Sequence, residues 1–91
     1  MTRDQFNSTV NGLGFDADTL EEGGMIMLSS SNLFGVAYDF NTLTLIVGFT
    51  AGTSYQYNGV PKAQIISLLS AGSHGSYFFH NIRTSYPYQR L

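Results

Sequence analysis

Residues 34–50, which read FGVAYDFNTLTLIVGFT, decide the fold of this chain. On both sides of Asn41-Thr42, apolar side chains alternate with small or polar ones, and this alternation is typical of strands that bury one face. The alternating apolar residues are Phe34, Val36, Tyr38 and Phe40 before the break and Leu43, Leu45, Val47 and Phe49 after it. Because the break is short and polar, the sequence predicts two antiparallel strands joined by a tight turn.

Further strands are expected on both sides of this hairpin. Downstream, residues 51–53 predict a second tight turn, and residues 54–57 return as a strand with Tyr55 and Tyr57 on one face. Upstream, residues 25–28 form a short apolar run. The predicted sheet is therefore a small antiparallel β-meander of three to four strands.

The residues after the meander change to a helical pattern. Pro61 suits the start of a helix because its φ is fixed and it has no N–H. Ile65, Leu68 and Leu69 then fall on one side of the helix, and Gly72 is expected to end it.

A second short helix is expected from Ser76, as its cap, to about Thr84. Phe78 and Ile82 are spaced four residues apart, so we expect both of them in the core. The tail, residues 86–91, is expected to be extended.

The N-terminal 28 residues form a separate extension in this interpretation. It consists of a short helix with a stripe of Phe6, Val10 and Leu13, an acidic loop over residues 16–24, and the short strand. The expected fold class is α+β, with the meander packed against two short C-terminal helices and a short N-terminal helix added.

Composition narrows the class of protein. The chain has 91 residues, of which 43% are hydrophobic and 11% are charged, and it has no cysteine. These values indicate one packed domain and exclude disulfides, thiol catalysis and thiolate metal sites. Because a core this small is only marginally stable, we expect a homo-oligomer.

Charge argues against long nucleic acids as partners. Six acidic residues and four basic ones give a formal charge of −2. Four cations allow few phosphate contacts, which suits a small ligand better than a long polymer. The start of the sequence has no signal-like region and no stretch has the length of a membrane span, so a cytoplasmic protein without a membrane partner is expected.

From residue 29 to residue 91 the sequence resembles the KTSC domain, a short module found at the C-terminus of some lysyl-tRNA synthetases and as small free-standing bacterial and phage proteins. The motifs that carry the resemblance are Ser30-Ser31, Tyr38-Asp39, Tyr55-Gln56-Tyr57, Val60-Pro61, Gly75-Ser76-Tyr77-Phe78, Ile82-Arg83, Tyr86, Tyr88 and Arg90. The resemblance implies a meander followed by helices and suggests RNA binding. His74 and Phe79-His80 replace residues that include basic ones in the family, so positive charge is lost here.

The candidate ligand-binding residues are cationic and aromatic side chains, most of them in the C-terminal third. They are Arg83, Tyr86, Tyr88, Arg90, His74, His80, Tyr77, Tyr55, Tyr57 and Ser31. Aromatic faces stack on bases while arginine binds phosphate oxygens. Tyr55 and Tyr57 have an alternative interpretation as core residues between sheet and helix. No catalytic residue, metal ligand or cofactor is predicted.

These observations favour a non-enzymatic protein that binds a small nucleotide or short oligonucleotide. Its role could be that of an oligomeric phage sponge, which sequesters a small cyclic nucleotide used as an immune signal. A module for single-stranded RNA or tRNA is the alternative, and a protein-protein interaction module is the third hypothesis.

Overall fold

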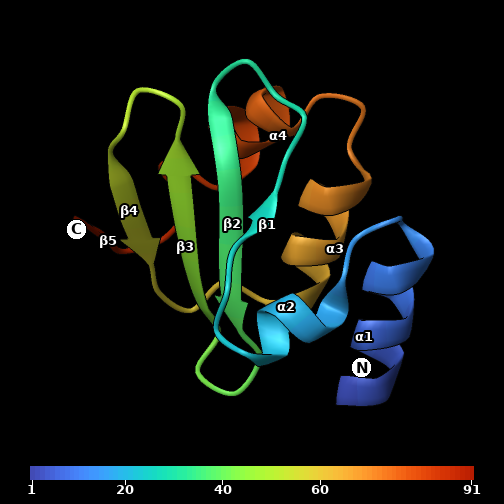
Figure 1. Ribbon diagram of the computed structural model, residues 1–91. Helices are drawn as coiled ribbons and strands as arrows, with labels where there is room; N and C mark the ends of the chain where they lie inside the picture. Colours follow the sequence, from blue (N-terminus) through green and yellow to red (C-terminus); the bar gives the residue numbers. More distant parts are fainter.

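The predicted hairpin lies at the centre of a five-stranded antiparallel sheet (Figure 1). The computed structural model describes residues 1–91. The strands follow one another in chain order and are β1 (Ile26–Met27), β2 (Leu33–Asp39), β3 (Thr44–Phe49), β4 (Ser54–Tyr57) and β5 (Tyr88–Arg90). The α+β meander is thus confirmed, with one strand more than the sequence predicted.

Strands β2 and β3 pair as their alternation predicts. Val36 lies opposite Val47, and Tyr38 lies opposite Leu45. All four of these side chains are buried, since paired residues of neighbouring strands share one face of a sheet. In the turn between the strands, Leu43 takes a positive φ of 58°.

The expectation for Phe34 was wrong. A bulge between Leu33 and Gly35 shifts the register of β2 against β3. The extra residue reverses the alternation, so that Leu33 is fully buried and Phe34 is 49% exposed.

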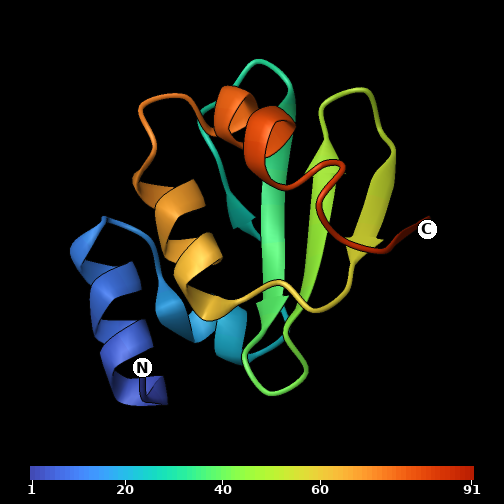
Figure 2. The same cartoon turned by 180° about the vertical axis from the view of Figure 1, so that it is seen from behind.

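Four helices accompany the sheet, and their bounds are α1 (Arg3–Gly12), α2 (Ala17–Glu21), α3 (Lys62–Ser70) and α4 (His74–Asn81). Figure 2 shows α3 and α4 in front of the sheet, with α1 beside α3. The opposite face, seen in Figure 1, is left largely open. The sheet therefore buries one face under helices, and the ends of these helices determine which part of that face stays accessible.

The break at Pro61 placed one helix boundary correctly, since Pro61 immediately precedes α3. The first helix, α1, is capped by Thr2, whose side chain accepts a hydrogen bond from the backbone N–H of Gln5. The cap of α4 is Ser73 and not Ser76, because the Ser73 side chain accepts from the N–H of Ser76.

The expected acidic loop over residues 16–24 contains the helix α2, whose N-cap is Asp16. The tail is extended as expected, and part of it forms the strand β5, which pairs with β4. Leu13 follows α1 as its C-cap and is exposed, so only Phe6 and Val10 of the predicted stripe are buried.

A single core joins the N-terminal residues to the rest of the chain. Phe6, which is 2% exposed, lies 5.7 Å from the ring of Tyr38 and 5.5 Å from that of Phe40. Ile65 of α3 and Phe78 of α4 are fully buried in the same cluster. The helix α1 is therefore packed into the core and is not an appendage to it.

Replacing Phe6 with alanine tests this packing. We expect Phe6→Ala to lower the free energy of unfolding by about 3–5 kcal/mol, because the ring is removed from a filled core. Urea unfolding of this variant and of Leu13→Ala measures the effect. Because Leu13 is exposed, Leu13→Ala should change the free energy of unfolding by less than about 0.5 kcal/mol. Equal small losses for both variants would show that α1 is not part of the core.

Candidate functional site

The principal candidate site is a groove between α4 and the strands β3, β4 and β5. Its volume is about 460 Å³. The groove is lined by Asn32, Phe49, Thr50, Ala51, Thr53, Tyr55, Tyr57, Phe78, Phe79, Arg83, Thr84 and Tyr88. We call it the aromatic groove, because aromatic rings make up half of its lining residues.

The floor of the aromatic groove is part of the core. Phe78 is fully buried, and its ring centroid lies 5.5 Å from that of Tyr57 and 5.6 Å from that of Phe49. Tyr57 is 3% exposed, and burial raises the pKa of its phenol. The core interpretation of Tyr57 is therefore correct.

One wall of the groove comes from the end of α4. Phe79 follows the buried Phe78 around the helix and is 44% exposed. The guanidinium of Arg83 lies 5.2 Å from the centroid of the Phe79 ring, within cation-π distance. Ile82 is fully buried, and the N–H of Arg83 donates to the carbonyl of Phe78, so the backbone that carries this cation is anchored.

The other wall consists of tyrosines on neighbouring strands. The Tyr55 ring lies 5.8 Å from that of Phe49 and 5.9 Å from that of Tyr88. Tyr88 is 59% exposed. An accessible aromatic face therefore stands on the opposite side of the groove from the Phe79–Arg83 pair.

Arg90 adds a second cation on the same face of the sheet. It pairs with Tyr55, and Tyr88 pairs with Tyr57. Paired residues point to the same face, so the Arg90 side chain leaves the sheet on the side of the groove. The site thus combines flat apolar surfaces with Arg83 inside and Arg90 beside it, which suits a planar ring that carries an anionic group.

The comparisons with known proteins agree with this architecture. The sequence model of the KTSC domain matches residues 29–86. The chain belongs to the KTSC domain family. The crystal structure of a KTSC domain protein from Yersinia pestis is similar, with a TM-score of 0.69 and 29% sequence identity over 74% of this chain and 94% of that one. No curated protein matches the chain.

Several predicted site residues of this KTSC domain lie away from the aromatic groove. Nδ1 of His74 is 2.8 Å from the carbonyl oxygen of Leu68, and the Tyr77 hydroxyl donates to Gln64, so both side chains bridge α3 and α4. Nδ1 of His80 is 2.8 Å from the Ser76 carbonyl oxygen on the surface of α4.

The other two predicted residues contribute to structure. Tyr86 is partly buried against the core. The backbone carbonyl of Ser31 accepts a hydrogen bond from the Thr50 hydroxyl and ties two loops together. Of the ten predicted residues, the groove collects Arg83, Tyr55, Tyr57 and Tyr88, with Arg90 alongside.

Sequence reasoning missed Phe79, Phe49 and Asn32 as lining residues. The position of Phe79 directly after a core residue was an available signal, because neighbouring residues on a helix point in different directions. Asn32 lies in a loop far from α4 in sequence, and only the packing of the sheet brings the two together.

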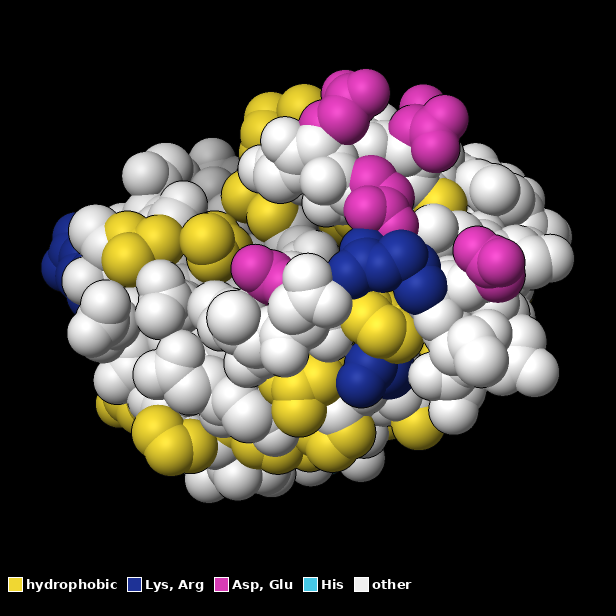
Figure 3. Space-filling model, turned by 90° about the horizontal axis from the view of Figure 1, so that it is seen from below, with side chains coloured by type: hydrophobic (Ala, Val, Ile, Leu, Met, Phe, Trp, Pro, Cys, Tyr) yellow, Lys and Arg dark blue, Asp and Glu magenta, His cyan; other side chains and the backbone are white.

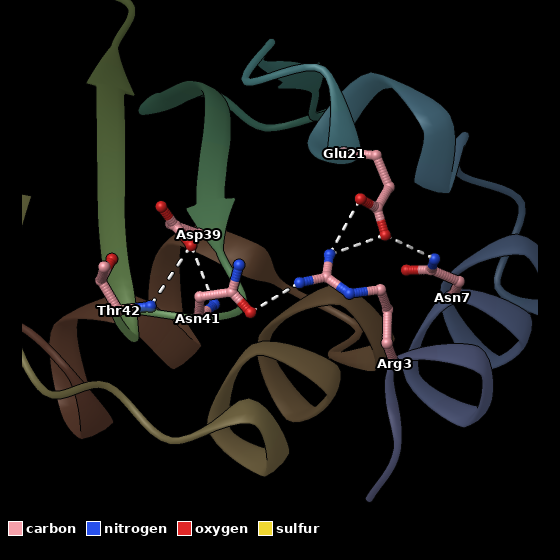
Figure 4. A network of polar contacts seen from close by, with 6 residues as sticks. All are labelled: Arg3, Asn7, Glu21, Asp39, Asn41 and Thr42. Atoms are coloured by element: carbon pink, nitrogen blue, oxygen red, sulfur yellow. Dashed lines mark hydrogen bonds and ion pairs between the residues drawn. The ribbon is translucent and has the colours of Figure 1, made fainter.

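A second cleft, of about 610 Å³, lies at the other end of the sheet (Figure 3). Arg3 stands in it, with its guanidinium 2.8 Å from Glu21 and 2.7 Å from the side-chain oxygen of Asn41 (Figure 4). The guanidinium carbon of Arg3 lies 4.9 Å from the centroid of the Phe40 ring, and the ammonium nitrogen of Lys62 lies 4.3 Å from the same centroid. Of these two cations, Arg3 is thus already paired with an acid.

Carboxylates make this second cleft acidic, and we call it the acidic cleft. Hydrogen bonds from Asn7 and Arg3 lower the pKa of Glu21, and backbone N–H groups of Asn41 and Thr42 lower that of Asp39. Both groups therefore stay ionised near neutral pH. An anionic ligand is disfavoured here, which leaves the aromatic groove as the better candidate for a phosphorylated one.

Two further observations concern metal ligands and membrane-spanning helices. No group of three or more His, Asp or Glu side chains comes together to hold a metal ion. None of the helices has the length and apolar character that crossing a membrane requires.

The Arg3–Glu21 contact predicts an acid dependence of stability. Since the pKa of Glu21 is lowered on folding from its ordinary 4.5, its contribution is present above about pH 4.5 and is lost as pH falls through the folded value. The melting temperature of Glu21→Gln should therefore fall less between pH 7 and pH 3 than that of the unmodified protein. Glu22→Gln, which removes a carboxylate with no ion pair, is the control. Identical pH profiles for Glu21→Gln and the unmodified protein would contradict this role.

Proposed function

We propose that this KTSC domain binds a small nucleotide in the aromatic groove and holds it without converting it. The observation that carries the proposal is the placement of Arg83 over Phe79, across the groove from the tyrosine rings. In this mode the base stacks on Tyr88 or Phe79, and the phosphate bonds to the guanidinium of Arg83.

The size of the groove supports a ligand of this class. Small-molecule sites commonly measure about 300–1,000 Å³, and the aromatic groove falls in that range. Each base that stacks on an aromatic side chain contributes roughly 1–3 kcal/mol. Stacking and one charge-assisted bond are the contacts that a mononucleotide or dinucleotide would make in this groove.

The distribution of cations supports a short ligand over a long one. Arg3 is bound to Glu21, and Lys62 lies over Phe40 at the other end of the molecule. Only Arg83 and Arg90 remain near the groove. Binding of a long RNA needs several phosphate contacts on one surface, and each contact adds to the salt dependence of the affinity. Single-stranded RNA is therefore the weaker candidate.

Substitutions at Arg83 test the proposal. Arg83→Ala should weaken binding of adenosine nucleotides or a cyclic dinucleotide, measured by calorimetry, by about 1.5–3 kcal/mol. Arg83→Lys should lose less, because it keeps the charge but not the planar fork. Lys62→Ala is the matched control, since it removes a cation that is distant from the groove.

Three results would contradict the proposal. They are unchanged affinity in Arg83→Ala, an equal loss in Lys62→Ala, and tighter binding of a single-stranded RNA of about 20 nucleotides with a steep salt dependence. The last result would favour the RNA-binding module. Melting temperatures of the same variants separate a loss of affinity from a loss of folded protein.

A further inference from the structure

Strand β5 lies at the outer edge of the sheet, beside β4 (Figure 1). All three of its residues are exposed. An edge strand presents unpaired N–H and C=O groups on its free side, and such a row can pair with another strand.

The hydrogen bonds of β5 show which groups are free. The carbonyl of Pro87 accepts from the N–H of Asn58, and the N–H of Leu91 donates to the carbonyl of Ser54. Backbone groups alternate in direction along a strand, so the backbone N–H and C=O of Gln89 also point toward β4, where Gln56 lies opposite. The N–H and C=O groups of Tyr88 and Arg90 therefore point away from the sheet.

We propose that β5 pairs antiparallel with β5 of a second copy of this chain, about a two-fold axis that passes at Gln89. In this register Tyr88 of each copy lies opposite Arg90 of the other. The outward backbone groups of these two residues then meet their complements across the axis. The two sheets become one continuous sheet, joined through identical surfaces as a two-fold axis requires.

The side chains favour this register over its neighbours. Directly opposed like charges destabilise a strand pair, and a register centred on Arg90 would place the two Arg90 side chains opposite each other. With the axis at Gln89, each Arg90 instead faces the ring of Tyr88, at a Cα separation of about 5.5 Å. An arginine over a tyrosine face is a favourable pair.

This pairing also changes the binding site. Tyr88 and Arg90 lie on the groove side of the sheet, so Arg90 of the second copy would stand beside Tyr88 at the edge of the aromatic groove. Each groove would then have Arg83 and Arg90 from its own chain and a further Arg90 from the second. The pairing of β5 stands independently of the proposed function, whereas this shared cation rests on it.

Cysteine crosslinking tests the register, because the protein has no cysteine of its own. Residues opposed across the axis at Gln89 form a non-hydrogen-bonded pair with Cα atoms about 4.5 Å apart, which is within disulfide range. Gln89→Cys should therefore form a disulfide-linked dimer under mild oxidation. Gln56→Cys, one strand further in on the same face, is the matched control. We expect Gln89→Cys to crosslink on the order of tenfold faster.

A proline substitution tests the backbone contacts. Arg90→Pro removes an outward N–H while leaving the bonds from Gln89 and Leu91 to β4 in place, and proline is tolerated on an edge strand. Arg90→Ala removes the same side chain but keeps the N–H. In sedimentation velocity, the unmodified protein should approach twice the mass of the 10.0 kDa chain as concentration rises. Arg90→Ala should weaken this dimer and Arg90→Pro should abolish it.

Several results would overturn the inference. They are a monomer at every concentration, crosslinking of Gln89→Cys no faster than that of Gln56→Cys, and a dimer that Arg90→Pro leaves intact. Calorimetry with a nucleotide is a separate measurement. A monomer that still binds nucleotide would refute the pairing alone, and a dimer that binds none would refute the proposed function alone.

Discussion

The burial of the Phe78 ring between helix and sheet is the constraint on which the site depends. It fixes α4 against β3 and β4 through its contacts with Phe49 and Tyr57. Once this ring is buried, the next residue, Phe79, has to face outward along the helix, and the turn that follows brings Arg83 over it. The aromatic groove is thus largely a consequence of core packing, and residues of the connecting loops, among them Asn32 and Thr53, complete its lining.

The two ends of the sheet offer opposite chemistry. At the aromatic groove the nearby cations are Arg83 and Arg90. At the acidic cleft Arg3 is bound to Glu21, and Asp39 stays ionised beside it. The same contacts join α1 and α2 to the turn between β2 and β3. The N-terminal residues, which precede the part of the chain that the family model matches, therefore complete the core and pair Arg3 with Glu21, while every residue that lines the aromatic groove lies within or just after the matched part.

Sequence patterns predicted the elements whose signals are local. The alternation around Asn41-Thr42 and the break at Pro61 were sufficient for the hairpin and for α3. They could not show β5, because its three exposed residues carry no alternation and become a strand only by pairing with β4. For the site, residue type selected Arg83 and Tyr88, and the structure brings both of them into the aromatic groove. It also selected His74, whose ring is used between helices, because residue type does not reveal which contacts a side chain has already made.

The central claim is that the aromatic groove, and not the acidic cleft, is the binding surface. Titration of the ¹⁵N-labelled protein with a mononucleotide, followed through amide chemical shifts, tests it most directly. The account predicts shifts at Asn32, Thr53, Tyr55, Phe79, Arg83 and Tyr88, with no change at Arg3, Glu21 or Asn41. Shifts centred on those last three residues, or none at millimolar nucleotide, would contradict it.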